Sequence, residues 1–366
     1  MPRPLIIDSD VGVDDVTAIL LASTHSDYSA HASAEALQLE AITVVDGNVS
    51  LPAAYQCAKT VMAVADVPES HVQVVAGAEG PLIPGLFKKV LWEGHGTDGL
   101  GGFTSRADEW NAFCQSHIPN HIPESLPENS TNRAAIELVT RAAANPGTLT
   151  LLALGPLTNV ALAISLDKNF LKNLKSLVIM GGSIDARGNS SRVSEFNFHC
   201  DPEAAHIVFH AAGLLEECNV TLIPWETTLD HALPWTFVDY LLGRVDGGES
   251  APSKLGAFLG GYVKFAEDAG RPLYEKASQE AARHEQYHTQ LNGFLMCDIY
   301  AAVCVIDPSC ILDSKKLHVH IELGGQYSRG MLAIDWNGWS GAKPNCNIVF
   351  KLDTDKIKGI FEKTFK

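Results

Sequence analysis

The sequence has little positive charge. Only 27 Lys and Arg residues stand against 43 Asp and Glu residues, and the formal net charge is −16. A surface of this sign repels nucleic acid and anionic membranes, so we expect neither as a partner. A neutral small molecule is not repelled, and the composition is compatible with such a partner.

Long apolar runs and paired cysteines are also absent. No apolar run reaches the ~18 residues that a membrane span needs. The first residues show neither the charged segment nor the apolar segment of a signal peptide. The eight cysteines include no CxxC pair, which is typical of reduced thiols. We therefore expect a cytoplasmic protein that does not associate with membranes.

Short apolar runs alternate with helical patterns over the first two thirds of the chain. This alternation predicts an α/β fold with an open, mostly parallel sheet and helices on both faces. A Gly/Pro-rich segment at 76–127 is expected as a long loop, and a helical cap is expected at about 232–296. We expect a single domain over 1–366. The predicted strands are 5–7, 39–45, 72–75, 149–154, 177–180, 220–223, 317–323, 330–334 and 347–352, and the predicted helices are 16–21, 53–65, 132–144, 157–166, 203–211, 299–306 and 354–365.

Four carboxylates lie between the first predicted strand and the first predicted helix: Asp8, Asp10, Asp14 and Asp15. Anions this close repel one another. The helix dipole offsets ~0.3–1 kcal/mol for each acid in the first turn, so a bound divalent cation would be the larger compensation. Oxygen ligands suit a hard ion such as Ca²⁺ or Mg²⁺. The carboxyl end of a strand is also the usual ligand crevice of an open α/β sheet.

Residues 8–15, DSDVGVDD, closely resemble the DxDPGxDD signature of the nucleoside hydrolases. Val11 takes the place of the usual Pro, and we expect it to loosen the turn slightly without touching a ligand. LALGPLTNVA at 152–161 and SEFNFHCDPEAA at 194–205 are similar to two further blocks of that family. Cys297-Asp298 matches its His-Asp pair, as in a subgroup of the inosine/uridine-preferring type that has Cys at the His position.

The resemblance implies a Rossmann-like core and hydrolysis of the N-glycosidic bond of ribonucleosides through an oxocarbenium-like transition state. It also implies Ca²⁺ as cofactor and a homodimer or homotetramer. Asp10 would take the proton of the attacking water. The implied metal ligands are Asp10, Asp15, Asp298 and the main-chain carbonyl of Leu154, and the implied substrate-binding residues are Asp14, Asn48, Met180, Asn189, Glu195, Phe196, Asn197 and Cys297.

The group that assists the leaving base is less clearly marked. A general acid contributes typically ~10²–10⁴-fold, and the family's His is missing. His95, in the HGTDG segment, resembles a His that faces the base in relatives, although a surface-loop His fits the same pattern. Trp92 or Trp225 could stack on a purine, or simply pack. The sequence leaves purine or pyrimidine preference open.

A literal HExxH, HEQYH at 284–288, is the signature of zinc metalloproteases. The residues on either side of it are highly polar, whereas a helix that holds a buried zinc ion needs an apolar face. One alternative is a solvated helix of the cap. Another is that Tyr287 or His288 contacts the nucleobase. A nucleoside-binding protein without activity is a further alternative, since the His before Asp298 is missing.

Overall fold

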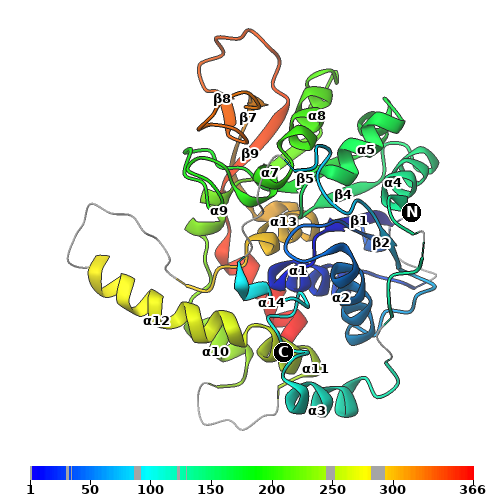
Figure 1. Ribbon diagram of the computed structural model, residues 1–366, viewed down its shortest axis with the longest axis vertical. Coiled ribbons are helices and arrows are strands. Elements are labelled where there is room, and N and C mark those ends of the chain that lie inside the picture. Colours follow the sequence, from blue (N-terminus) through cyan, green and yellow to red (C-terminus); the bar gives the residue numbers. More distant parts are fainter. Residues whose placement is uncertain are drawn as a thin grey trace.

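A mixed sheet of nine strands runs through the molecule in the order β3-β2-β1-β4-β5-β6-β9-β7-β8 (Figure 1). The computed structural model describes residues 2–29, 33, 35–85, 92–121, 124–128, 130–244, 252–281 and 293–366. The strands are β1 (Arg3–Ser9), β2 (Leu37–Val44), β3 (Gln73–Ala76), β4 (Thr150–Ala153), β5 (Ser176–Met180), β6 (Val220–Ile223), β7 (Ile311–Ile321), β8 (Leu332–Asp335) and β9 (Cys346–Leu352).

The pairing confirms a mostly parallel sheet. Neighbouring strands are parallel from β3 through β9. The antiparallel strands β7 and β8 extend one edge. β7 starts at Ile311, six residues before its predicted start, because the exposed polar residues at 313–316 interrupt the apolar pattern that marks a strand.

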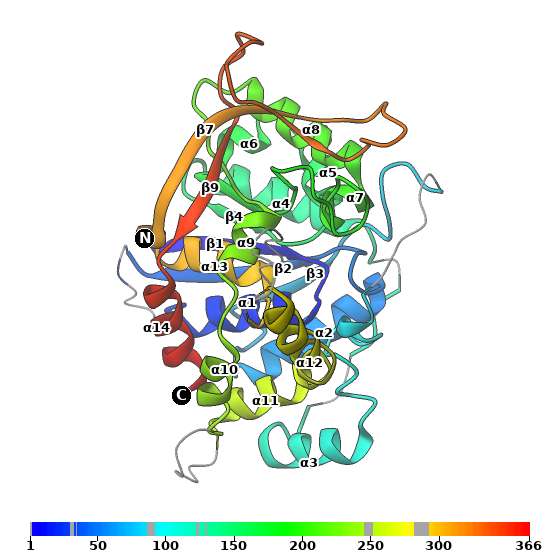
Figure 2. The ribbon, with the colours of Figure 1, turned by 90° about the vertical axis from the view of Figure 1, so that its left-hand side faces the viewer.

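Helices cover both faces of the sheet (Figure 2). One layer contains α4, α5, α6 and α8, and the other contains α1, α2, α13 and α14. The helices are α1 (Val13–Thr24), α2 (Leu51–Val64), α3 (Ala107–His117), α4 (Arg133–Ala144), α5 (Thr158–Leu166), α6 (Phe170–Asn173), α7 (Phe196–Cys200), α8 (Pro202–Gly213), α9 (Trp225–Asp230), α10 (Trp235–Leu241), α11 (Lys254–Tyr262), α12 (Lys264–Ala281), α13 (Cys297–Ile306) and α14 (Thr354–Phe365), with 3₁₀ turns η1 (Glu93–His95) and η2 (Pro308–Cys310).

Strand alternation divides the core into two apolar clusters. Leu5 and Ile7 of β1 pack into the cluster under α1 and α13, while Ile6 packs into the cluster under α5 and α8. All three side chains are fully buried. A strand buried on both faces has a continuous apolar sequence, which is why β1 was recognisable.

The predicted cap contains α10, α11 and α12, and α12 projects from the body in Figure 1. The segment expected as a long loop contains the helix α3. Only Phe113 of α3 is buried, so the sequence has no strong apolar stripe there. The HEQYH segment lies outside the described residues. Within the described chain, no helix is both long enough and apolar enough to cross a membrane.

Candidate active site

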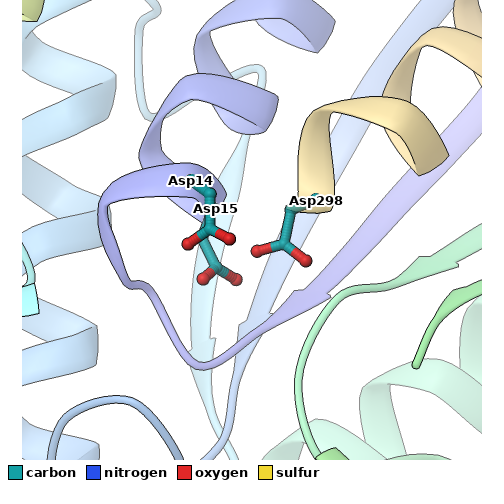
Figure 3. A group of neighbouring side chains, drawn as sticks. All are labelled: Asp14, Asp15 and Asp298. Carbon is teal, nitrogen blue, oxygen red and sulfur yellow. The ribbon is translucent and has the colours of Figure 1, made fainter. Parts of the chain in front are cut away.

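Three carboxylates from opposite ends of the chain meet at the first turns of two helices (Figure 3). Asp14 and Asp15 lie in the first turn of α1, and Asp298 lies in the first turn of α13. Each offers an oxygen, and these oxygens lie within 4.8 Å of one another. The close packing of α1 against α13 brings them together.

Burial and mutual repulsion disfavour the charged forms of these three acids. Burial, and then the charges of Asp14 and Asp15, raises the pKa of Asp298 well above its usual range. Burial and the Asp15 charge likewise raise the pKa of Asp14 to about 7. Oδ1 of Asp14 is buried and has no hydrogen-bond partner among the described residues. Buried polar atoms are rarely left without a partner, so the cluster fits a divalent cation bound by oxygen ligands.

The turn between β1 and α1 orients Asp15. The hydroxyl of Ser9 donates to Oδ1 of Asp15 at 2.6 Å, and the amide of Gly12 donates to Oδ2 at 2.8 Å. The Asn48 side-chain amide also donates to this Oδ2 at 3.2 Å. These three donors fix the rotamer of Asp15, and the sequence had not singled out Ser9.

Asn48 connects Asp10 with the three-acid cluster. Its backbone amide donates to Oδ2 of Asp10 at 2.6 Å, and its side-chain amide donates to Oδ1 at 3.2 Å. Asp10 is fully buried. A Cβ at Gly47 would lie 1.9 Å from Oδ2 of Asp10, so only glycine allows the loop after β2 to approach that carboxylate.

Asp8, part of the acidic run in the sequence, is hydrogen-bonded inside the sheet. Its Oδ1 accepts from the hydroxyl of Thr43 at 2.5 Å and from the side-chain amide of Asn159 at 2.8 Å. Burial raises the pKa of Asp8 to about 7, although both hydrogen bonds lower it. Asn159 belongs to the LTN segment, and its role in holding Asp8 was not predicted.

The EFN segment sits beside the ends of β4 and β5. The side-chain amide of Asn197 donates to the main-chain oxygen of Leu154 at 2.7 Å and to that of Met180 at 3.2 Å. The Glu195 carboxylate caps α7 by accepting the amide of Asn197 at 2.9 Å, and it accepts the amide of Gly182 at 2.8 Å. Phe196, partly buried, begins α7. The Asn197 and Glu195 side chains therefore tie this segment to main-chain atoms at the ends of β4 and β5.

His95 and Cys297 both lie against the three-acid cluster. The Val13 amide donates to Nδ1 of His95 at 3.2 Å, and this Nδ1 lies 3.9 Å from Oδ1 of Asp14. Burial lowers the pKa of His95 to about 4. The Cys297 amide donates to Oδ2 of Asp14 at 3.1 Å, and burial, followed by the charge of Asp14, raises the pKa of its thiol well above the usual value.

Two positions depart from the expected picture of the site. Asn189 is exposed, and its Oδ1 accepts the hydroxyl of Ser190 at 3.2 Å; no contact in the described part of the chain joins it to the acids. Val11 is fully buried with φ +48°. Its amide donates to the Ser9 hydroxyl at 3.1 Å. Val11 thus has a backbone conformation that β-branched residues rarely adopt, and whether it loosens the turn relative to Pro stays a prediction.

The fold and this site define an α/β protein that places carboxylates able to hold a metal ion at the carboxyl ends of its strands. The chain belongs to the inosine-uridine preferring nucleoside hydrolase family, whose model matches residues 5–359. It is a ribonucleoside hydrolase, as its motifs predicted, and its family acts on small nucleosides.

Individual proteins agree with this assignment along almost the whole chain. An inosine-uridine preferring nucleoside hydrolase of Leishmania major is 32% identical, covering 98% of this chain and 95% of that protein. A probable uridine nucleosidase of Oryza sativa subsp. japonica is 34% identical, with coverages of 96% and 90%. The solved structure of an inosine-guanosine nucleoside hydrolase superposes with a TM-score of 0.77 at 29% identity, covering 100% of this chain and 98% of that one.

Proposed function

We propose that this hydrolase releases base and ribose from inosine- and uridine-like nucleosides with the help of Ca²⁺. Asp10, Asp15, Asp298 and the main-chain oxygen of Leu154 would hold the ion. The observation that carries the proposal is the meeting of the Asp14, Asp15 and Asp298 oxygens within 4.8 Å, where Asp15 and Asp298 are buried and Asp14 is partly buried. Inosine and uridine are the substrates in the names of the related enzymes.

A bound divalent cation supplies positive charge that lowers the pKa of water and attracts the ribose hydroxyls. Asp10 is the proton acceptor in this scheme. It is buried and held by two hydrogen bonds from Asn48, so it needs no reorganisation before accepting a proton from water. A positioned base of this kind contributes ~10²–10⁴-fold to the rate.

The remaining polar groups would bind the sugar. Oδ1 of Asp14 has no partner in the described chain and is the atom we assign to the ribose 2′-hydroxyl, with Asn48 beside it. The Asn197 amide nitrogen already donates to Leu154 and Met180, which leaves its Oδ1 for the 3′-hydroxyl together with Asp298. We assign Glu195, Phe196 and Cys297 to the rest of the ribose pocket, and we assign Asn189, which is exposed, to the outer edge of that pocket. Carboxylates around the ring stabilise the positive charge that develops on the sugar.

His95 would assist the departing base as a neutral hydrogen-bond donor. A pKa of about 4 keeps its ring neutral near pH 7. Since Nδ1 accepts the Val13 amide, the ring proton lies on Nε2, where it can donate to the base. The edge-on contact with Trp92, with ring centroids 4.9 Å apart, restricts rotation of the imidazole.

Release of free ribose from inosine and uridine tests the reaction. We expect the chelator-treated protein to be inactive and added Ca²⁺ to restore both activities. Asp10→Ala should lower kcat by at least ~10²-fold while circular dichroism shows an intact fold. Asp185→Ala, a change at an exposed acid, is the matched control. Wild-type turnover by Asp10→Ala would contradict the assignment of Asp10 as the base. Activity of the chelator-treated protein without added Ca²⁺ would contradict the proposed requirement for a metal ion.

We further infer one cooperative domain over 1–366, assembled as a homodimer or homotetramer in the cytoplasm. β1 and β9, from opposite ends of the chain, belong to the same sheet, which supports a single unit. All eight cysteines are free thiols, which suits a reducing compartment. Light scattering on the purified protein measures the assembly, and a monomer at micromolar concentration would contradict it.

A further inference from the structure

Four histidines, His206, His210, His318 and His320, form a patch away from the acid cluster, which we call the histidine patch. His206 and His210 lie one turn apart on α8, with rings nearly parallel at 10° and centroids 6.0 Å apart. His318 and His320 alternate on β7, so they point to the same side of the strand. α8 packs against β7 (Figure 2).

The side of α8 that carries His206 and His210 faces His318 and His320 of β7. Gly213 lies one further turn along this side, and a Cβ placed there would come within 3.9 Å of Cε1 of His318. His206 and His210 also act electrostatically on His320. The patch therefore brings together imidazoles from segments more than a hundred residues apart.

The Nε2 atoms of His318 and His320 face each other, close to the arrangement that two imidazoles adopt around one metal ion. Nδ1 of His318 lies 2.7 Å from the carbonyl of Lys343, to which it can only donate, so Nε2 carries the free lone pair. Metal-ligating histidines are usually fixed by such a bond. The two Nε2 atoms lie 2.8 Å apart. Zn–N bonds of ~2.0–2.1 Å at a tetrahedral angle place two nitrogens about 3.4 Å apart, so small side-chain rotations would admit the ion.

The patch is suited to a cation in two further respects. His320 is exposed, but partial desolvation, and then the charges of the other three histidines, lowers its pKa, which favours the neutral form that binds metals. Nδ1 of His206 is buried and has no hydrogen-bond partner among the described residues. The unpartnered Nδ1 costs free energy in the metal-free protein, and a neutral imidazole is the form that binds a metal.

We propose that the histidine patch binds a divalent transition metal, Zn²⁺ foremost, at a site separate from the acid cluster. His318 and His320 are the primary ligands, completed by His206 or His210. Imidazole nitrogen favours Zn²⁺, Ni²⁺ or Cu²⁺ over Ca²⁺, which takes oxygen ligands. The two sites thus accept different ions, and an ion at the patch would link α8 to the antiparallel strand β7.

Calorimetric titration with ZnCl₂, with Ca²⁺ saturating the acid cluster, tests the proposal. We expect the wild type to bind one Zn²⁺ ion more per chain than the His318→Ala/His320→Ala double variant, or to bind Zn²⁺ with a dissociation constant at least about tenfold lower. Cu²⁺ bound to the wild type should show nitrogen coupling in its electron paramagnetic resonance spectrum, and this coupling should weaken in the variant. Ribose release should be unchanged, which confirms that the variant is folded.

Two controls separate the patch from other histidines. His71→Ala changes an exposed histidine elsewhere and should leave Zn²⁺ binding intact. His284→Ala/His288→Ala removes the HEQYH histidines and should also leave it intact. Equal Zn²⁺ affinity of the wild type and the His318→Ala/His320→Ala variant overturns the proposal, as does loss of binding only in the HEQYH variant. Absence of Zn²⁺ binding in the wild type would show that the two rings form only a mutual hydrogen bond.

Discussion

Asp298→Asn is the substitution that best distinguishes a cation site from an ordinary buried polar cluster. Asp298 is buried and pairs with Asp15, while Asp14, Asp15 and Asp10 all repel its charge. Two unit charges 4.8 Å apart would repel by about 3.5 kcal/mol at an effective dielectric constant of ~20, and because the pKa of Asp298 is raised, its protonation relieves part of this cost in the metal-free protein. Asn keeps the shape and removes the charge. We therefore expect the metal-free variant to be as stable as the wild type, or more stable by up to about 3 kcal/mol.

Thermal unfolding with Ca²⁺ or with chelator measures both halves of this prediction. A chain of 366 residues has an unfolding entropy of about 0.8 kcal/mol/K, so 3 kcal/mol corresponds to about 4 °C in Tm. Ca²⁺ at ~100 times its Kd should stabilise the wild type by about 2.7 kcal/mol, and Asp298→Asn should lose most of that gain. Asp307→Asn, just beyond the other end of α13, should keep it. A metal-free variant that melts several degrees below the wild type and still gains the full Ca²⁺ shift would refute the reasoning.

Two further substitutions test the surroundings of the site. Burial raises the pKa of Glu195 from 4.5 to about 7, so its contribution to stability is complete below pH ~4.5 and is lost, by up to about 3 kcal/mol, as pH rises through 7. In urea unfolding, the free energy of unfolding of the wild type should therefore fall relative to that of Glu195→Gln as pH rises from about 4.5 to 7. A difference between the two proteins that does not change with pH would contradict the raised pKa. Val11→Pro fixes φ near −65° in place of +48° and removes the amide bonded to Ser9. This substitution should lower the free energy of unfolding by about 3 kcal/mol or more and weaken Ca²⁺ binding. A variant as stable as the wild type would show that residue 11 does not need the left-handed conformation.

The sheet was largely predictable because each parallel strand is a short, continuous apolar run. The bounds of β6 and α14 agree with those read from the sequence. α3 was missed because its exposed surface is polar and only Phe113 is buried. The first half of β7 was missed for a related reason: its stability comes from main-chain pairing with β9, which leaves no pattern in the side chains.

The candidate site was predictable to the level of segments but not of individual atoms. Strand ends and helix starts indicated where acids would gather, and the structure brings Asp298 to Asp14 and Asp15 across 283 residues. Which acid faces the cluster depends on hydrogen bonds to distant residues. Asp8 is held by Thr43 and Asn159, and no spacing rule in the sequence separates it from its neighbours.

Positions that violate local rules of stability concentrate around the turn after β1. Val11 is a β-branched residue with positive φ. Asp8 and Asp14 each have a buried oxygen without a hydrogen-bond partner among the described residues. Asp298 is buried among other carboxylates. Natural sequences are otherwise locally consistent, and such violations persist where the surrounding structure enforces them and function requires them. α1 and α13 supply that enforcement here because most of their other residues are buried and apolar. The packing of these two helices thus maintains the charge repulsion that a bound cation would relieve.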